Sequence, residues 1–214
     1  MKAMILAAGR GERLRPLTDT LPKPLLEVRG KALIVHHLVA LAAAGFEAVV
    51  INLSWLGEQI REHLGDGRRF GLKIEYSEEA EALETAGGIL QALDLLGERF
   101  IVVNADIVTD FDFSRLRHRQ SQAHLVLVEN PPHNPAGDFS LDGDLVGNQQ
   151  DKRFTFSGIS MFDRHFFDGL EQGSRPLAPL LRAAADRQQL SGEIYAGNWA
   201  DIGTLERLNS LSSV

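Results

Sequence analysis

The stretch Met1–Thr18, MKAMILAAGRGERLRPLT, decides the fold class, because an apolar run passes directly into a loop of glycines and arginines. Residues 4–8 are apolar and end at Gly9, which is typical of a buried strand. Continuous apolar strands are typical of parallel sheets that are covered on both faces. We therefore predict a central strand of an α/β sheet, followed by a loop that binds a ligand.

The first hundred residues continue this pattern of apolar strands and helices. Further strands are predicted over 48–52, 72–76 and 100–103, and helices over 32–44, 55–64 and 86–95. Alternation of this kind predicts a doubly wound, mostly parallel sheet with right-handed crossovers.

The second half of the chain has a different pattern. Strands are predicted over 123–129 and 154–162, an extended stretch over 193–195, and helices over 177–187 and 204–211. Asp142-Gly143 is a strong turn signal and predicts a hairpin over 138–145. We expect one α/β domain over 1–214 with a mixed, mostly parallel sheet and a small β-hairpin lobe over one end of the sheet.

Composition narrows the function classes. The 214 residues are 44% apolar and 24% charged, with a net charge of −7 and no cysteine. Disulfides, thiolate metal sites and cysteine nucleophiles are therefore excluded. The acidic balance argues against a nucleic-acid-binding face, and no stretch approaches the roughly 18 apolar residues of a membrane span. The N-terminal run is also too short for a signal peptide. We expect a cytoplasmic enzyme or binding protein.

The loop after the first strand has the residue types of a phosphate site. Gly9 and Gly11 lack side chains, so their backbone N–H groups can approach a phosphate closely. Arg13 and Arg15 supply guanidinium donors, and Lys23, held between two prolines, adds a point charge. A solvated basic loop would explain the glycines alone. The combination favours a triphosphate or pyrophosphate site.

The two commonest nucleotide-binding fingerprints are absent from this loop. GRGERL differs from the P-loop pattern G-x-x-x-x-G-K-[ST]. The dinucleotide pattern G-x-G-x-x-G fails because position 14 is leucine. A nicotinamide-dependent oxidoreductase is therefore disfavoured.

Acidic residues follow two later strands and could act with this loop. Asp106, in VVNADIV, and Asp201, in NWADIGT, could bind Mg²⁺, which takes carboxylates together with substrate phosphates. Each could instead cap a turn or helix. The segment 78–88, EEAEALETAGG, could accept the edge of a nucleotide base or form a charged surface loop.

Six motifs together resemble the sugar-1-phosphate nucleotidyltransferase family over nearly the whole chain: LAAGRGERLRP, PKPL, ETAGG, NAD, FSGI and WADIGT. The resemblance implies the family's Rossmann-like fold, with a nucleotide half over about 1–110 and a sugar-phosphate half over about 111–214. Glu12, Glu84 and the GDF at 137–139 resemble a subgroup of short bacterial uridylyltransferases in cell-wall recycling. That subgroup implies UTP and N-acetylmuramate α-1-phosphate as substrates. Glucose 1-phosphate with dTTP or UTP, or mannose 1-phosphate with GTP, stays open.

The resemblance also implies a role for individual residues. Arg13, Lys23 and Asp106 would be catalytic, and Asp106 and Asp201 would bind Mg²⁺. The nucleotide would contact Ala8, Gly9, Gly11, Glu12, Arg13, Lys23, Glu79 and Gly87, and the sugar phosphate would contact Asn104, Asp138 and Gly158. For a lactyl carboxylate, Lys152, Arg153 and Arg182 are candidate partners. We expect a monomer without a fused acyltransferase or regulatory domain. A regulatory protein that keeps the fold without catalysis is the rival class.

Overall fold

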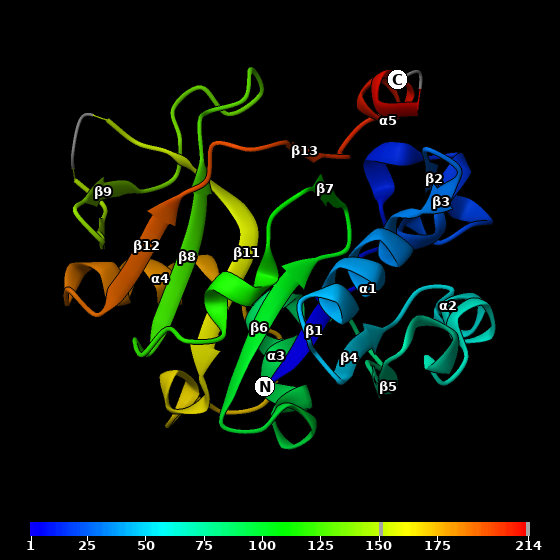
Figure 1. Cartoon of the computed structure of the whole chain (residues 1–214), viewed down its shortest axis with the longest axis horizontal. Helices are drawn as coiled ribbons and strands as arrows, with labels where there is room; N and C mark the ends of the chain where they lie inside the picture. The colour runs from blue at the N-terminus through cyan, green and yellow to red at the C-terminus, as the bar shows by residue number, and fades with distance from the viewer. Residues whose placement is uncertain (150–151, 213–214) are drawn as a thin grey trace.

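The computed structural model describes residues 1–149 and 152–212, so positions 150, 151, 213 and 214 of the expected domain lie outside it. A nine-stranded sheet with the order β5-β4-β1-β6-β11-β8-β12-β10-β9 forms its centre (Figure 1). In this order the strands are β5 (Lys73–Glu78), β4 (Ala48–Leu53), β1 (Lys2–Leu6), β6 (Arg99–Asn104), β11 (Thr155–Asp163), β8 (Ala123–Val128), β12 (Leu190–Ile194), β10 (Leu145–Gly147) and β9 (Ser140–Asp142).

The strand directions confirm the mixed, mostly parallel sheet. Strands β5, β4, β1 and β6 pair in parallel, β11 runs antiparallel to β6 and β8, and β12 is parallel to β8. The β9–β10 hairpin forms where the Asp142-Gly143 signal predicts it. Its second strand pairs with β12 at Leu145 and Ser191. The hairpin therefore extends the edge of the large sheet instead of lying over its end.

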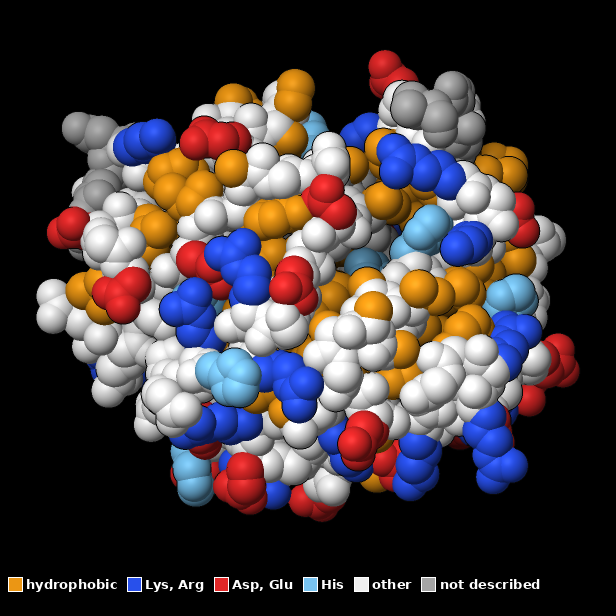
Figure 2. Space-filling model, viewed as in Figure 1, with side chains coloured by type: hydrophobic (Ala, Val, Ile, Leu, Met, Phe, Trp, Pro, Cys, Tyr) orange, Lys and Arg blue, Asp and Glu red, His pale blue; other side chains and the backbone are white. Residues whose placement is uncertain are grey.

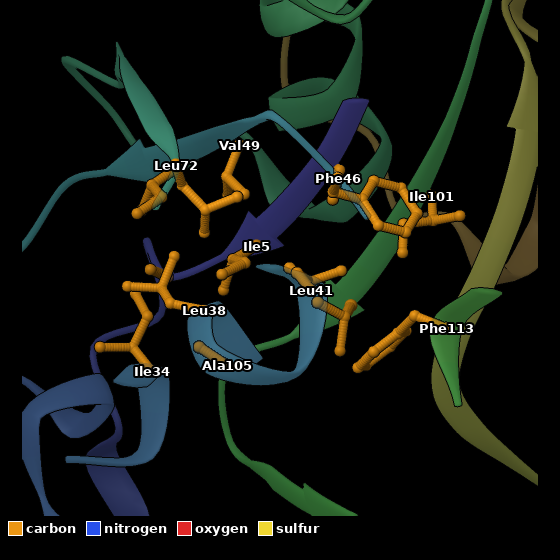
Figure 3. Close-up of a cluster of buried hydrophobic side chains, with 14 of the residues drawn as sticks. Ile5, Ile34, Leu38, Leu41, Phe46, Val49, Leu72, Ile101, Ala105 and Phe113 are labelled. Atoms are coloured by element: carbon orange, nitrogen blue, oxygen red, sulfur yellow. The ribbon is translucent and has the colours of Figure 1, made fainter. Parts of the chain in front are cut away.

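Alternating side chains of β1 face two different apolar layers. Ala3 and Ile5 belong to an apolar cluster with residues of α1 (Leu33–Ala43), whereas Met4 belongs to a cluster with residues of α3 (Glu84–Leu96) and α4 (Ala178–Asp186). Figure 3 shows Ile5 beside Leu38 and Leu41 of α1. Each fully buried side chain of this kind stabilises the fold by about 1.5–3 kcal/mol. The carboxyl end of β1 is thus held rigidly from both faces.

Two short strand pairs were not expected from the sequence. β2 (Glu27–Val28) pairs with β3 (Lys31–Ala32), and β7 (Ile107–Thr109) pairs with β13 (Trp199–Asp201). The second pair brings the late segment of the chain back to the carboxyl end of β6, as Figure 1 shows. The pairing sets Asp201 opposite Ile107, one residue after Asp106.

The last helix, α5 (Leu205–Ser212), follows β13 and packs near the start of the chain. Leu208 belongs to a small apolar cluster with Leu14, Val28 and Ile202. This cluster joins the glycine loop to the C-terminal segment. The remaining helix, α2 (Gly57–Leu64), follows β4.

The surface over α1 carries charges of both signs. Figure 2 shows Lys and Arg side chains among Asp and Glu on this face, with apolar side chains between them. Within residues 1–149 and 152–212, no helix has the length and apolar character needed to cross a membrane.

Candidate active site

A cavity of about 890 Å³ lies at the carboxyl ends of β1, β4 and β6. This is the place where ligands bind in open α/β sheets. Nine of the thirteen predicted site residues line it: Ala8, Gly9, Gly11, Glu12, Arg13, Lys23, Glu79, Asn104 and Asp106. The other four predicted residues, Gly87, Asp138, Gly158 and Asp201, lie outside the cavity lining.

The glycine loop is shaped by two different requirements. Gly11 has a φ of 69°, and a Cβ there would lie 3.0 Å from Thr18 Cγ2 and 3.1 Å from Lys23 Cβ. The Thr18 hydroxyl donates to the Gly11 carbonyl at 2.9 Å, which closes the loop. A Cβ at Gly9 would meet nothing within 4 Å. Gly11 therefore permits tight packing, while the backbone at Gly9 stays open to a ligand.

Charged side chains of the same loop line the cavity. Within the described chain, the side chains of Glu12 and Arg13 have no hydrogen-bond or ion-pair partner. Arg10, which sequence reasoning did not single out, lies 4.5 Å from the centre of the Trp55 ring and also lines the cavity. The indole of Trp55 donates to the Thr18 carbonyl, which fixes the ring. Two arginines of this loop thus face the cavity.

Lys23 and Asp106 form the ion pair at the bottom of the site. Lys23 Nζ lies 2.5 Å from Asp106 Oδ2, and the two side chains are 11% and 29% exposed. Lys23 begins a short 3-10 turn after Pro22, and the Leu25 N–H donates to the Pro22 carbonyl at 2.8 Å. The predicted phosphate lysine and the predicted metal carboxylate are therefore in direct contact.

A buried polar network joins the ends of β1, β4 and β5. Asn52 Oδ1 accepts from the Ala7 N–H at 2.8 Å, and Asn52 Nδ2 donates to Glu79 Oε1 at 2.7 Å. Glu79 Oε2 accepts from the Leu83 N–H at 3.2 Å, and the residue is 7% exposed. Sequence reasoning missed Asn52. The signal was a polar residue at the end of an otherwise apolar strand.

The start of α3 packs tightly against another loop. Glu84 lines the cavity with a φ of 60°, a left-handed conformation that is uncommon outside glycine. A Cβ at Gly87 would overlap the Gly173 carbonyl and stand 3.2 Å from the Arg175 nitrogen. Gly87 thus lets α3 approach this loop, and its contact with a nucleotide base stays a prediction.

Of the three residues predicted to contact the sugar phosphate, one lies in the cavity lining. Asn104 lines the cavity, and Gly158 stands directly behind it with a φ of 81°. A Cβ at Gly158 would lie 2.7 Å from Asn104 Nδ2. Asp138 accepts a hydrogen bond from the Phe156 N–H at 2.8 Å, and its carbonyl accepts one from Arg182. Asp138 therefore shapes the hairpin region.

The carboxylate of Asp201 is held by two cationic or polar neighbours. Both of its oxygens lie 2.6 Å from Arg207 Nη1, and Oδ1 lies 3.0 Å from His133 Nε2. The Ile202 N–H donates to the Asp106 carbonyl at 2.8 Å, so the two predicted metal ligands stand on adjoining backbone. No signal in the sequence pointed to His133 or Arg207, which lie on a loop and a helix.

The two aspartates offer hard oxygen donors, which fits Mg²⁺. This ion is usually held by one or two carboxylates together with substrate phosphates and waters. A group of three or more His, Asp or Glu side chains that could hold a metal by itself does not occur in the part of the chain that the structure describes. The donor set is therefore suited to a metal that arrives with its substrate.

His37 lies beneath the turn that carries Asp106. It is 2% exposed, its ring bonds to the backbone of Ile107, and it packs edge-on against Phe113. Burial lowers the pKa of His37 to about 4, although the Ile107 hydrogen bond opposes this shift. A neutral imidazole thus supports the β6–β7 turn.

Comparison with known proteins gives close and distant relatives. An N-acetylmuramate alpha-1-phosphate uridylyltransferase of Neisseria meningitidis serogroup B is 52% identical over 226 aligned positions, which cover 100% of this chain and 98% of that protein. A mannose-1-phosphate guanylyltransferase of Mycobacterium tuberculosis is 32% identical over 95% of this chain, which spans 61% of that protein.

Solved structures share the fold at low identity. A Bacillus anthracis protein assigned as a glucose-1-phosphate thymidylyltransferase superposes with a TM-score of 0.88 and 22% identity, covering 100% of this chain and 94% of that one. Such identity shows the fold alone. The sequence pattern of the nucleotidyl transferase family matches residues 2–213. This chain therefore belongs to the nucleotidyl transferase family of enzymes.

Proposed function

We propose that this protein transfers a uridylyl group from UTP to N-acetylmuramate α-1-phosphate and releases pyrophosphate. The observation that carries this proposal is the end-to-end similarity to the Neisseria meningitidis enzyme, 52% identical over 100% of this chain. The cavity supports it, because glycine backbone, two arginines and Lys23 surround the space in which a triphosphate would lie.

The reaction needs positioning and charge stabilisation more than covalent catalysis. An oxygen of the sugar phosphate attacks the α-phosphorus of UTP, and the bond to the bridging oxygen breaks as pyrophosphate leaves. The attacking phosphate is already anionic, so no strong general base is required. Arg13 and Lys23 would stabilise the negative charge that develops on the transferred and leaving groups.

Mg²⁺ held by Asp106 and Asp201 would neutralise phosphate charge and help to orient the substrates. Each carboxylate is paired with a protein cation, Asp106 with Lys23 and Asp201 with Arg207. These two side chains therefore carry the countercharge of the aspartates until substrates bind.

The base and the sugar would occupy opposite ends of the cavity. We assign the base to the end formed by Ala8, Glu79 and the start of α3, where Glu79 already accepts two protein hydrogen bonds. We assign the sugar phosphate to Asn104, with Gly158 and Asp138 shaping its surroundings. We also propose that the enzyme is a monomer.

Pyrophosphate release tests the proposal. Each of UTP, dTTP and GTP is combined with N-acetylmuramate, glucose and mannose 1-phosphates, with and without Mg²⁺. The proposal expects release that depends on Mg²⁺ and is fastest for UTP with N-acetylmuramate 1-phosphate. Another pair that reacts faster would refute the substrate assignment, and no release from any pair would refute catalysis by this protein.

A further inference from the structure

We infer that Arg207, from the C-terminal helix α5, is a second guanidinium that binds the pyrophosphate end of the nucleotide beside Arg13. The inference rests on the proposed function, because it adds a residue to the same site. The main observation behind it is that the side chains of Arg13 and Arg207 both lie close to Gly203, which lines the cavity.

The space around Gly203 shows that the two guanidinium groups lie close to the same backbone position. A Cβ on Gly203 would stand 3.2 Å from Arg13 Nη1 and would overlap the Arg207 guanidinium. Gly203 itself lines the cavity. Arg13 comes from the first loop, and Arg207 lies six residues after Asp201. Segments from the two ends of the chain therefore bring two guanidinium groups to one position on the wall.

The charges at this position are out of balance. Arg207 is paired with Asp201, whereas the Arg13 side chain has no hydrogen-bond or ion-pair partner within residues 1–149 and 152–212. Two like charges at short range repel each other, and one carboxylate compensates only one of them. Two neighbouring guanidinium groups can each donate a pair of hydrogen bonds to phosphate oxygens. The excess positive charge thus points to a phosphate-bearing anion.

The contact with Asp201 leaves part of the Arg207 guanidinium at the cavity wall. Both Asp201 oxygens contact Arg207 Nη1, whereas a Cβ on Gly203 would overlap Nη2, so Nη2 can donate to an anion while the ion pair with Asp201 persists. A divalent cation on Asp201, the carboxylate that we assign to it, would weaken this ion pair. The rival explanation is that Arg207 only fixes α5 to β13. Leu208 already anchors α5 in an apolar cluster with Leu14 and Ile202. The helix therefore has an attachment that does not need Arg207.

Pyrophosphate binding to the metal-free protein separates the two explanations. Isothermal titration compares the wild type with Arg207→Ala, Asp201→Asn and Glu206→Gln, an exposed acid on the same helix as control. We expect Arg207→Ala to weaken pyrophosphate binding at least about tenfold, because it removes charge-assisted hydrogen bonds to the anion. Asp201→Asn should bind as tightly as the wild type or tighter, because it frees Arg207. Glu206→Gln should leave the affinity unchanged.

A purely structural role for Arg207 predicts a different result. Arg207→Ala and Asp201→Asn each break the same ion pair, so both would then weaken binding alike. The inference would be overturned if both variants weakened binding alike. It would also be overturned if Arg207→Ala kept the wild-type affinity, or if the wild type did not bind pyrophosphate. If the wild type forms the UDP-sugar while Arg207→Ala keeps its affinity, only the inference fails. If no substrate pair reacts, the proposed function fails independently.

Discussion

Lys23 Nζ lies 2.5 Å from Asp106 Oδ2, although the two residues are 83 positions apart in the chain. The contact joins the proline-flanked turn to the carboxyl end of β6 across the cavity. The lysine and the carboxylate that we propose for the phosphate reaction are thus in direct contact. Their charges balance each other, whereas Arg10 and Arg13 of the glycine loop also line the cavity.

Replacement of Lys23 by alanine should reduce kcat about 10²- to 10³-fold. That is the effect of removing one preorganised electrostatic donor from a site where charge develops. The measurement is steady-state pyrophosphate release. As a control, Lys31→Ala removes an exposed lysine from the short β2–β3 pair and should leave the rate unchanged. Equal effects of the two substitutions would contradict the role of Lys23.

Asp106→Ala should abolish most activity while the protein stays folded. The carboxylate is partly exposed and its loss leaves Lys23 without a partner, but the surrounding apolar core is untouched. Circular dichroism and the melting temperature check the fold, and pyrophosphate release checks the rate. A folded Asp106→Ala variant with wild-type activity would rule out a metal or catalytic role.

Asn52→Leu should lower the free energy of unfolding by about 2–4 kcal/mol. The leucine leaves the Ala7 N–H and a Glu79 oxygen without their buried partner, and each unsatisfied group costs about 1–3 kcal/mol. Urea denaturation measures the loss. Ser54→Ala, on the same rim, is the control. A loss below about 1 kcal/mol would show that the network adds little to stability.

Gly158→Ala should raise the KM for the sugar 1-phosphate more than the KM for UTP. The added Cβ would lie 2.7 Å from Asn104 Nδ2, so the amide must move. Gly143→Ala is a matched control, because its φ of 61° is strained by a side chain but its Cβ meets nothing within 4 Å. Both variants should lose about 1–2 kcal/mol of stability. An unchanged KM in Gly158→Ala would remove Asn104 from the sugar site.

His37 should make stability fall as the pH drops below about 6.5. Its pKa is about 4 in the folded protein, against 6.5 as its ordinary value. The unfolded chain therefore binds more protons in this interval, and the stability present above pH 6.5 is lost toward pH 4. The slope for one proton is about 1.4 kcal/mol per pH unit. Urea unfolding between pH 6.5 and 5 should show this extra slope in the wild type relative to His37→Leu.

An exposed histidine supplies the control for that experiment. His118→Gln should keep the wild-type slope, because its side chain is open to solvent. Parallel stability curves for the wild type and His37→Leu would show that His37 takes up its proton equally in the folded and unfolded states.

The long apolar strands could be predicted from the sequence, and the short pairs could not. Residues 48–51 and 100–103 are continuous apolar runs, so burial alone defines most of β4 and β6. β7 and β13 have three residues each and exist because they pair with each other across some ninety residues of chain. Such pairing depends on tertiary structure, which local patterns do not encode.

The same distinction applies to the site. Gly11, Lys23 and Asp106 could be predicted because they follow strands and carry phosphate chemistry, and the structure places them around one cavity. Arg207 and His133 could not, because a helical arginine and a loop histidine look like ordinary surface residues. Only their contacts with Asp201 in the structure single them out.

A competition reaction tests the central claim most directly. The enzyme is incubated with Mg²⁺, equal concentrations of UTP, dTTP and GTP, and equal concentrations of N-acetylmuramate, glucose and mannose 1-phosphates. The nucleotide sugars formed are then identified by mass spectrometry. We predict that UDP-N-acetylmuramate is the dominant product from the first time point. A dominant GDP-mannose or dTDP-glucose product would contradict the account.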